Sequence, residues 1–146
     1  MVPILEPADA HQEENRLLLE EAGMIILGDG DGLALARTLQ ESPAVAGMAL
    51  ALASGALIVG WGAGAAPLGE WVVTPQGVEL GWGWISGAVV VPYFSGAAQQ
   101  PQLQAVLRRR PGMLGIGIPE DTALALGPDG QVETWGVGEV TVVVAR

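Results

Sequence analysis

Short apolar runs that end at glycine-rich turns constrain the fold of this chain more than any other feature. Residues 24–27 and 56–60 are apolar without polar alternation, and each run is followed by a turn, at residues 28–32 and 61–65. Runs of this kind are typical of parallel strands that are covered on both faces. Helical patterns separate them along the chain, and this alternation predicts an α/β fold. We expect three layers, with a mostly parallel sheet, helices on both of its faces and an antiparallel hairpin near the C-terminus.

Local signals place the remaining elements within one domain, residues 1–146. Ser42 is a good N-cap, and Pro43 is a good first residue for a helix that runs to residue 53. The Gly-Pro-Asp-Gly turn at residues 127–130 joins the two strands of the hairpin. The expected helices are 12–22, 33–40, 43–53, a short one ending near 69, and 99–110; the expected strands are 24–27, 56–60, 88–91, 114–118, 122–126, 131–135 and 139–144, with residues 71–86 a hairpin or an irregular segment.

The charge and the apolar pattern exclude two classes of partner. A net charge of −10 repels phosphate backbones, so we do not expect nucleic-acid binding. No apolar run approaches the roughly 20 residues of a membrane helix, and residues 1–10 lack the basic residue of a signal peptide. We therefore expect a soluble, cytoplasmic protein without membrane contacts.

Missing residue types limit the chemistry of the chain. There is no cysteine, which excludes disulfides, a thiolate nucleophile and zinc–thiolate sites. There is no lysine, which excludes Schiff-base chemistry and a P-loop. The single histidine, His11, precedes a polar Gln-Glu-Glu-Asn run, and we interpret it as a solvated residue at the start of a helix rather than a catalytic base. No cofactor or metal site is predicted.

The turn after the second strand has the form of a nucleophile elbow. Residues 60–65 read Gly-Trp-Gly-Ala-Gly-Ala, with Gly62 at the apex. Glycines on both sides permit a strained strand-to-helix turn that holds the apex residue over the sheet.

Residues 56–68 resemble the nucleophile segment of the cyanophycinase and aspartyl dipeptidase family of serine peptidases, in which the elbow reads G-T-S-A-G-A and the fold is class I glutamine-amidotransferase-like. Four further segments resemble the same family in the same order along the chain. They are residues 26–33, ILGDGDGL, similar to F-T-G-G-D-Q-L; residues 81–95, GWGWISGAVVVPYFS, similar to G-L-G-L-L-x-x-V-V-V-D-Q-H-F-S; residues 115–123, GIGIPEDTA, similar to G-I-G-I-D-E-D-T-A; and residues 136–144, GVGEVTVVV, similar to G-x-G-x-V-x-V-V.

The resemblance implies that the catalytic pair is missing. The family's serine falls on Gly62 and its histidine on Tyr93, while Glu79 is a loose candidate for the acidic group between them. Without a hydroxyl–imidazole pair, the chain has no activated serine oxygen to attack a carbonyl as the family's enzymes do. The residues that the resemblance implies for an oxyanion-binding loop are Gly30, Asp31, Gly32 and Ala63.

These substitutions predict a non-catalytic homologue that acts as a binding or assembly protein. One alternative is a hydrolase of acidic or β-aspartyl peptides with an unorthodox site, for example water activated by Glu79. A second alternative is a structural subunit of a larger complex. The family's chain begins about two βα units earlier, each of roughly 30 residues, and the loss of these units would open an apolar sheet edge. We therefore expect a homodimer or a complex with another α/β subunit.

Two acidic pairs have alternative interpretations. Asp29 and Asp31 are candidates for a cation or amine site, but a Gly-Asp loop that caps the next helix is the interpretation we favour. Glu120 and Asp121 are candidates for the acid pair of a glycoside hydrolase. Because adjacent residues point apart, we interpret them as structural.

Three tryptophans lie near the degenerate site in the matched segments: Trp61, Trp82 and Trp84. They are candidates for the lining of a ligand pocket. We favour the alternative, that they fill space left by the lost residues or form a subunit interface.

Overall fold

The two apolar runs that end at glycine-rich turns form neighbouring parallel strands. In the computed structural model, which describes residues 1–96 and 98–145, β1 (Met24–Leu27) and β2 (Leu57–Gly60) pair from Met24 with Leu57 to Leu27 with Gly60. Both strands therefore end at the same edge, and the turns that follow them are neighbours.

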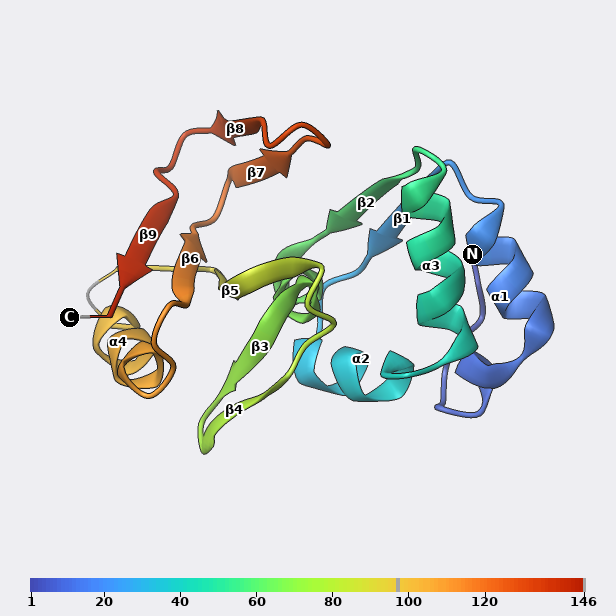
Figure 1. Ribbon diagram of the computed structural model, residues 1–146, viewed down its shortest axis with the longest axis horizontal. Helices are drawn as coiled ribbons and strands as arrows, with labels where there is room; N and C mark the ends of the chain where they lie inside the picture. The colour runs from blue at the N-terminus through green and yellow to red at the C-terminus, as the bar shows by residue number, and fades with distance from the viewer. Residues whose placement is uncertain (97, 146) are drawn as a thin grey trace. The chain divides into compact units, whose positions relative to one another are not determined.

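Helices complete this first unit of the chain, Met1–Gly64. They are the 3₁₀ helix η1 (Asp9–His11) and the α-helices α1 (Glu13–Glu20), α2 (Gly32–Leu39) and α3 (Pro43–Ala53). Figure 1 shows α1 and α3 side by side, and Gly47 permits this approach because a Cβ there would clash with the backbone of Arg16. Leu19, Ile25 and Met48 are among the buried residues of the unit.

The second unit begins at Ala65 and is built on a five-stranded sheet in the order β4-β3-β5-β6-β9. Its strands are β3 (Gly69–Thr74), β4 (Gly77–Leu80), β5 (Ile85–Pro92), β6 (Leu114–Ile118) and β9 (Thr141–Val144). The pairs β3–β5 and β5–β6 are parallel, and the edge strands β4 and β9 pair antiparallel. The strands β7 (Thr122–Leu126) and β8 (Val132–Gly136) form a separate hairpin, and η2 (Gly62–Leu68) lies at the boundary of the two units.

One helix, α4 (Gln100–Arg108), covers a face of the five-stranded sheet. Its Leu103 lies directly over Gly115 of β6, where a Cβ would clash with the leucine side chain. Leu103 and Leu107 pack into a core with Val89, Phe94 and Val143. The core therefore fixes the ends of β5 and β6 against α4.

The α/β class and the C-terminal antiparallel hairpin are confirmed, with parallel and antiparallel strand pairs in the same molecule. Ser42 caps α3 as expected, because its hydroxyl accepts from the N–H of Val45 at 3.2 Å. β5 begins earlier than the expected strand 88–91: its start at Ile85 is decided by ladder pairing with β3, not by hydrophobic pattern. The expectation of a single domain stays a prediction.

No helix within the described residues is long and apolar enough to cross a membrane.

Candidate functional site

The turn after β2 has the conformation of an elbow. Trp61 N–H donates to the Leu27 carbonyl oxygen at 2.9 Å, which continues the β1–β2 ladder by one residue. Gly62 then has a φ of 54°, in the left-handed region, where glycine is unstrained and other residues cost about 1 kcal/mol or more. The chain turns back at once, with Gly64 N–H donating to the Trp61 carbonyl at 3.0 Å. Gly62 is therefore the apex, as the sequence predicts, and it presents no side chain.

The far side of the elbow lies directly on the end of β1. A Cβ at Gly64 would clash with the carbonyl oxygens of Leu27 and Gly28, the latter at 2.5 Å. The elbow can therefore approach the end of β1 this closely only because residue 64 is glycine.

The loop after β1 supplies two carboxylates with different partners. Asp31 caps α2, because its Oδ1 accepts from the N–H groups of Leu33 at 3.0 Å and Ala34 at 2.9 Å. The helix-cap interpretation is confirmed for this residue. Asp29 instead reaches across to the elbow, where its Oδ1 accepts from the N–H of Ala63 at 2.8 Å.

This loop holds the remaining residues of the predicted oxyanion-binding segment. Gly30 has a φ of 139°, which favours glycine, and Gly32 is the first residue of α2. The structure thus brings this loop and Ala63 together. The contact is made by the side chain of Asp29, which is not among the residues predicted for the oxyanion-binding loop.

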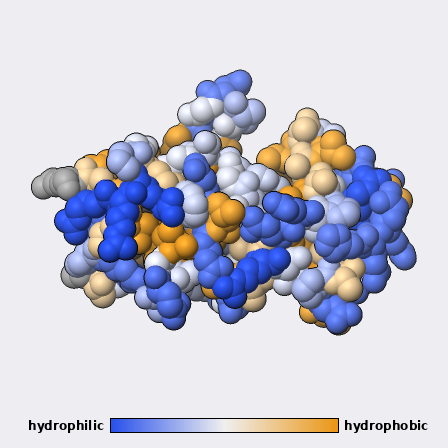
Figure 2. Space-filling model, turned by 60° about the horizontal axis from the view of Figure 1, so that its bottom comes forward, coloured by the Kyte–Doolittle hydropathy of each residue, from blue (hydrophilic) through white to orange (hydrophobic). Residues whose placement is uncertain are grey.

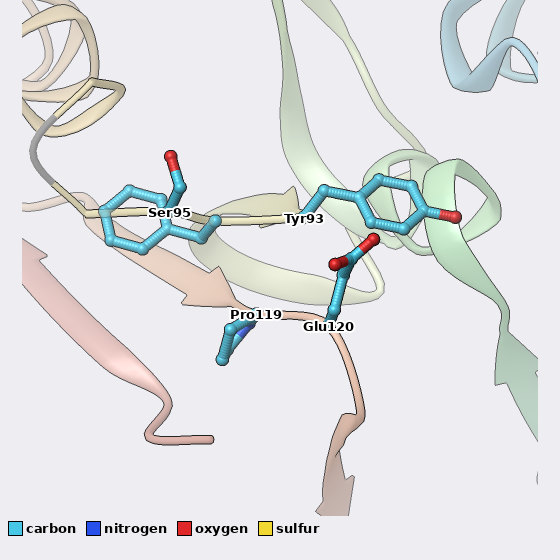
Figure 3. A pocket seen from close by; sticks show the side chains of 5 residues that line it. Tyr93, Ser95, Pro119 and Glu120 are labelled. Atoms are coloured by element: carbon cyan, nitrogen blue, oxygen red, sulfur yellow. The ribbon is translucent and has the colours of Figure 1, made fainter. Parts of the chain in front are cut away.

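A second feature is a pocket of about 470 Å³ at the ends of β5 and β6 (Figure 3). It is lined by Tyr93, Phe94 and Ser95, which follow β5, and by Pro119 and Glu120, which follow β6. Because these neighbouring strands are parallel, their carboxyl ends meet at one edge of the sheet, the usual place for a ligand site in such folds.

The loop after β5 is held in a strained conformation. Tyr93 has a φ of 55°, a region that costs a non-glycine residue about 1 kcal/mol or more. Gln99 stabilises it, with Nε2 donating to the Tyr93 carbonyl at 3.3 Å and Oε1 accepting from the Ser95 N–H at 2.7 Å. Phe94 N–H donates to the Ile118 carbonyl at 3.0 Å and ties this loop to the end of β6.

The acidic residue of this pocket is Glu120, which the sequence alone favours as a structural residue. Figure 3 shows the carboxylate of Glu120 pointing toward the ring of Tyr93. Glu79, the acidic group suggested from the sequence, lies instead in the edge strand β4, opposite Val72. Residues that directly follow two adjacent parallel strands lie together, so Glu120 could be placed near Tyr93 once β5 and β6 are known to be neighbours. That strand order is a property of the tertiary structure and cannot be read from the sequence.

The three tryptophans separate into two groups. Trp61 is 66% exposed beside the apex of the elbow in the first unit. Trp82 and Trp84 contact each other in the second unit, with ring centroids 5.4 Å apart, and neither lines the pocket at Tyr93. Within the described residues, no group of three histidine, aspartate or glutamate side chains is arranged to hold a metal ion.

The sequence profile of Peptidase family S51 matches residues 2–133. The chain belongs to this peptidase family. A cyanophycinase from Synechococcus elongatus is 32% identical over 95% of the chain, and one from Trichormus variabilis is 28% identical over 98%. The crystal structure of a peptidase from an acI-B1 Actinobacterium is similar with a TM-score of 0.78 and 26% identity, over 99% of this chain and 66% of the other.

Membership of the peptidase family confirms the resemblance that the five segments indicated. The chain spans about half the length of the curated relatives it matches, 47% and 52% of the two cyanophycinases. The elbow around Gly62 and the pocket lined by Tyr93 and Glu120 both lie within the residues that the family profile matches, 2–133.

Proposed function

We propose that this chain is a non-catalytic member of the peptidase family that acts as a binding or assembly protein. The observation that carries the proposal is Gly62, which occupies the apex of an intact elbow with a φ of 54° and has no side chain. An elbow exists to present a nucleophilic oxygen or sulfur atom, and glycine offers neither.

The second support is the position that the resemblance assigns to the base. Tyr93 stands there, next to the carboxylate of Glu120. A phenol, with an ordinary pKa near 10, does not take up a proton at neutral pH as an imidazole does. An acidic neighbour that would orient an imidazole therefore has no imidazole to orient.

The test is hydrolysis of a panel of aspartyl and β-aspartyl peptides by the purified protein, with an active cyanophycinase measured in parallel. We expect no turnover by this chain. A second arm uses the double variant Gly62→Ser, Tyr93→His: turnover that appears only in this variant supports a scaffold that has lost its chemistry. Turnover by the wild-type chain at a rate near that of the cyanophycinase would overturn the proposal.

The alternative is a hydrolase of acidic or β-aspartyl peptides with an unorthodox site. It is favoured by the preserved elbow and by a pocket that still holds a carboxylate, Glu120. In this case a carboxylate activates water, and turnover by the wild-type chain is abolished by Glu120→Gln or by Glu79→Gln. Turnover that survives both substitutions would exclude this mechanism.

Assembly is proposed with a second copy of the chain or with another α/β subunit. Apolar side chains support it on the β1–β2 pair: Met24, Ile26 and Leu57 are 53–62% exposed, and the first two alternate with buried residues on one face. Figure 2 shows further hydrophobic residues, in orange, at the surface of the face in view. Light scattering at micromolar protein tests the homodimer, and a sharp monomer peak would count against it.

A further inference from the structure

The amide that follows the apex of the elbow is already hydrogen-bonded to a carboxylate of the same chain. Ala63 N–H donates to Oδ1 of Asp29 at 2.8 Å. In an elbow of this kind, the N–H of the residue after the apex is a donor for the oxyanion that forms when a carbonyl is attacked. The Asp29 oxygen therefore stands where such an oxyanion would have to accept its hydrogen bond.

We propose that Asp29 is an internal block of the oxyanion position. The inference rests on the proposed function and deepens it, because the elbow then lacks a free oxyanion donor as well as a nucleophile. Two negatively charged oxygens cannot share this N–H, since they would repel each other at contact distance. A substrate carbonyl can reach the amide only if the carboxylate is displaced.

The surroundings hold the Asp29 carboxylate in this place. On one side, the loop is anchored through Asp31, whose side chain caps α2. On the other side, the elbow is bonded to the end of β1 through Trp61 and packed on it through Gly64. The contact joins residues 34 positions apart, so it is a tertiary contact and not a local turn.

The sequence at this position supports a role specific to this chain. Asp29 stands where the resembling loop, F-T-G-G-D-Q-L, has its first glycine, and a glycine there brings no carboxylate to the elbow. A single glycine-to-aspartate difference at position 29 is therefore sufficient to occupy the Ala63 N–H group.

The contact itself is tested by hydrogen exchange of the Ala63 amide, measured by NMR on ¹⁵N-labelled protein. In Asp29→Ala the amide loses its charged acceptor, and we expect its exchange to become at least about tenfold faster. Asp29→Asn keeps an acceptor oxygen and should protect the amide better than alanine does. Asp31→Asn is the matched control, because it removes the same charge from the same loop and asparagine is an equally good N-cap. Exchange in Asp29→Ala within about twofold of wild type would overturn the proposal.

The block is tested by covalent labelling in the Gly62→Ser, Tyr93→His background with a fluorophosphonate. The hydroxyl oxygen of the introduced serine bonds to phosphorus, the P–F bond breaks, fluoride leaves, and the hydroxyl proton is taken up by the buffer. Adding Asp29→Ala should raise the labelling rate by about 100-fold, the usual effect of one oxyanion donor. Equal rates with and without Asp29→Ala, or no labelling in either, would overturn the block.

The two proposals fail in different ways. Peptide hydrolysis by the wild-type chain would contradict the non-catalytic function, whatever Asp29 does. An exchange rate of the Ala63 amide that does not change in Asp29→Ala would contradict the block and leave the non-catalytic function in place.

Discussion

A methyl group at residue 64 should destabilise the protein although it is the smallest change available. In Gly64→Ala, the new Cβ would lie 2.5 Å from the Gly28 carbonyl oxygen and closer still to that of Leu27. Ordinary contacts of a Cβ lie at 3.4–4 Å, so the elbow and the end of β1 must move apart by about 1 Å, the difference between 2.5 Å and 3.4 Å. Both obstacles are backbone atoms, which cannot rotate away as a flexible side chain can.

The expected loss is about 1–3 kcal/mol of unfolding free energy, the usual cost of overpacking a tight site. With a urea m-value of about 2 kcal/mol/M for a chain of this size, the midpoint should fall by about 0.5–1.5 M. The assay is equilibrium urea unfolding followed by circular dichroism, with the m-value required to stay constant.

Gly28→Ala is the matched control. Gly28 belongs to the same contact, but a Cβ on it would meet no atom within 4 Å, and its φ is not in the left-handed region. This variant should unfold within about 0.5 kcal/mol of wild type, as surface substitutions usually do. If Gly64→Ala were as stable as Gly28→Ala, the claim that only glycine fits between the elbow and the end of β1 would be refuted.

Three further predictions concern strain and charge. Glu41 is exposed with a φ of 53° between α2 and α3, so Glu41→Gly should stabilise the chain by up to about 1 kcal/mol in urea unfolding and Glu41→Ala should not. In Tyr93→His, the Glu120 carboxylate should raise the pKa of the introduced imidazole above its ordinary value, and adding Glu120→Gln should lower it again; an NMR titration that shows no difference would remove Glu120 from the neighbourhood of residue 93. The guanidinium of Arg16 donates to Glu13 at 2.7 Å and lowers the pKa of that carboxyl. This contribution to stability is therefore present above the ordinary pKa of 4.5 and is lost as the pH falls through the lowered value. Glu13→Gln should remove that part of the acid dependence of unfolding, with a small effect that salt weakens further.

Local chemistry made much of the fold predictable. The strand β1 is the expected run of residues 24–27, because an uninterrupted apolar run bounded by glycines has few other solutions. The start of α3 follows from Ser42 and Pro43 for a similar reason, since both the cap and the first-turn proline act within four residues. The elbow also belongs to this class, because its glycines permit the turn wherever the chain places it.

Contacts between segments that are distant along the chain could not be predicted from the sequence. The sequence favours Asp29 as a turn residue, with a cation ligand as the alternative, but its bond to Ala63 depends on β1 and β2 being parallel and in register. The sequence favours Glu120 as a structural residue, but its place beside Tyr93 depends on β5 and β6 being adjacent. No local pattern contains the order of strands in a sheet.

The sequence by itself therefore determined the α/β class, the elbow and the absence of a side chain at Gly62, since each depends on residue types and on spacing within a few positions. The tertiary structure alone decided which carboxylate meets which group: Asp29 at the Ala63 amide and Glu120 at Tyr93. The physical reason is that a hydrogen bond or a shared pocket needs atoms within a few ångströms, and separation along the chain does not encode that distance when the partners lie on different strands.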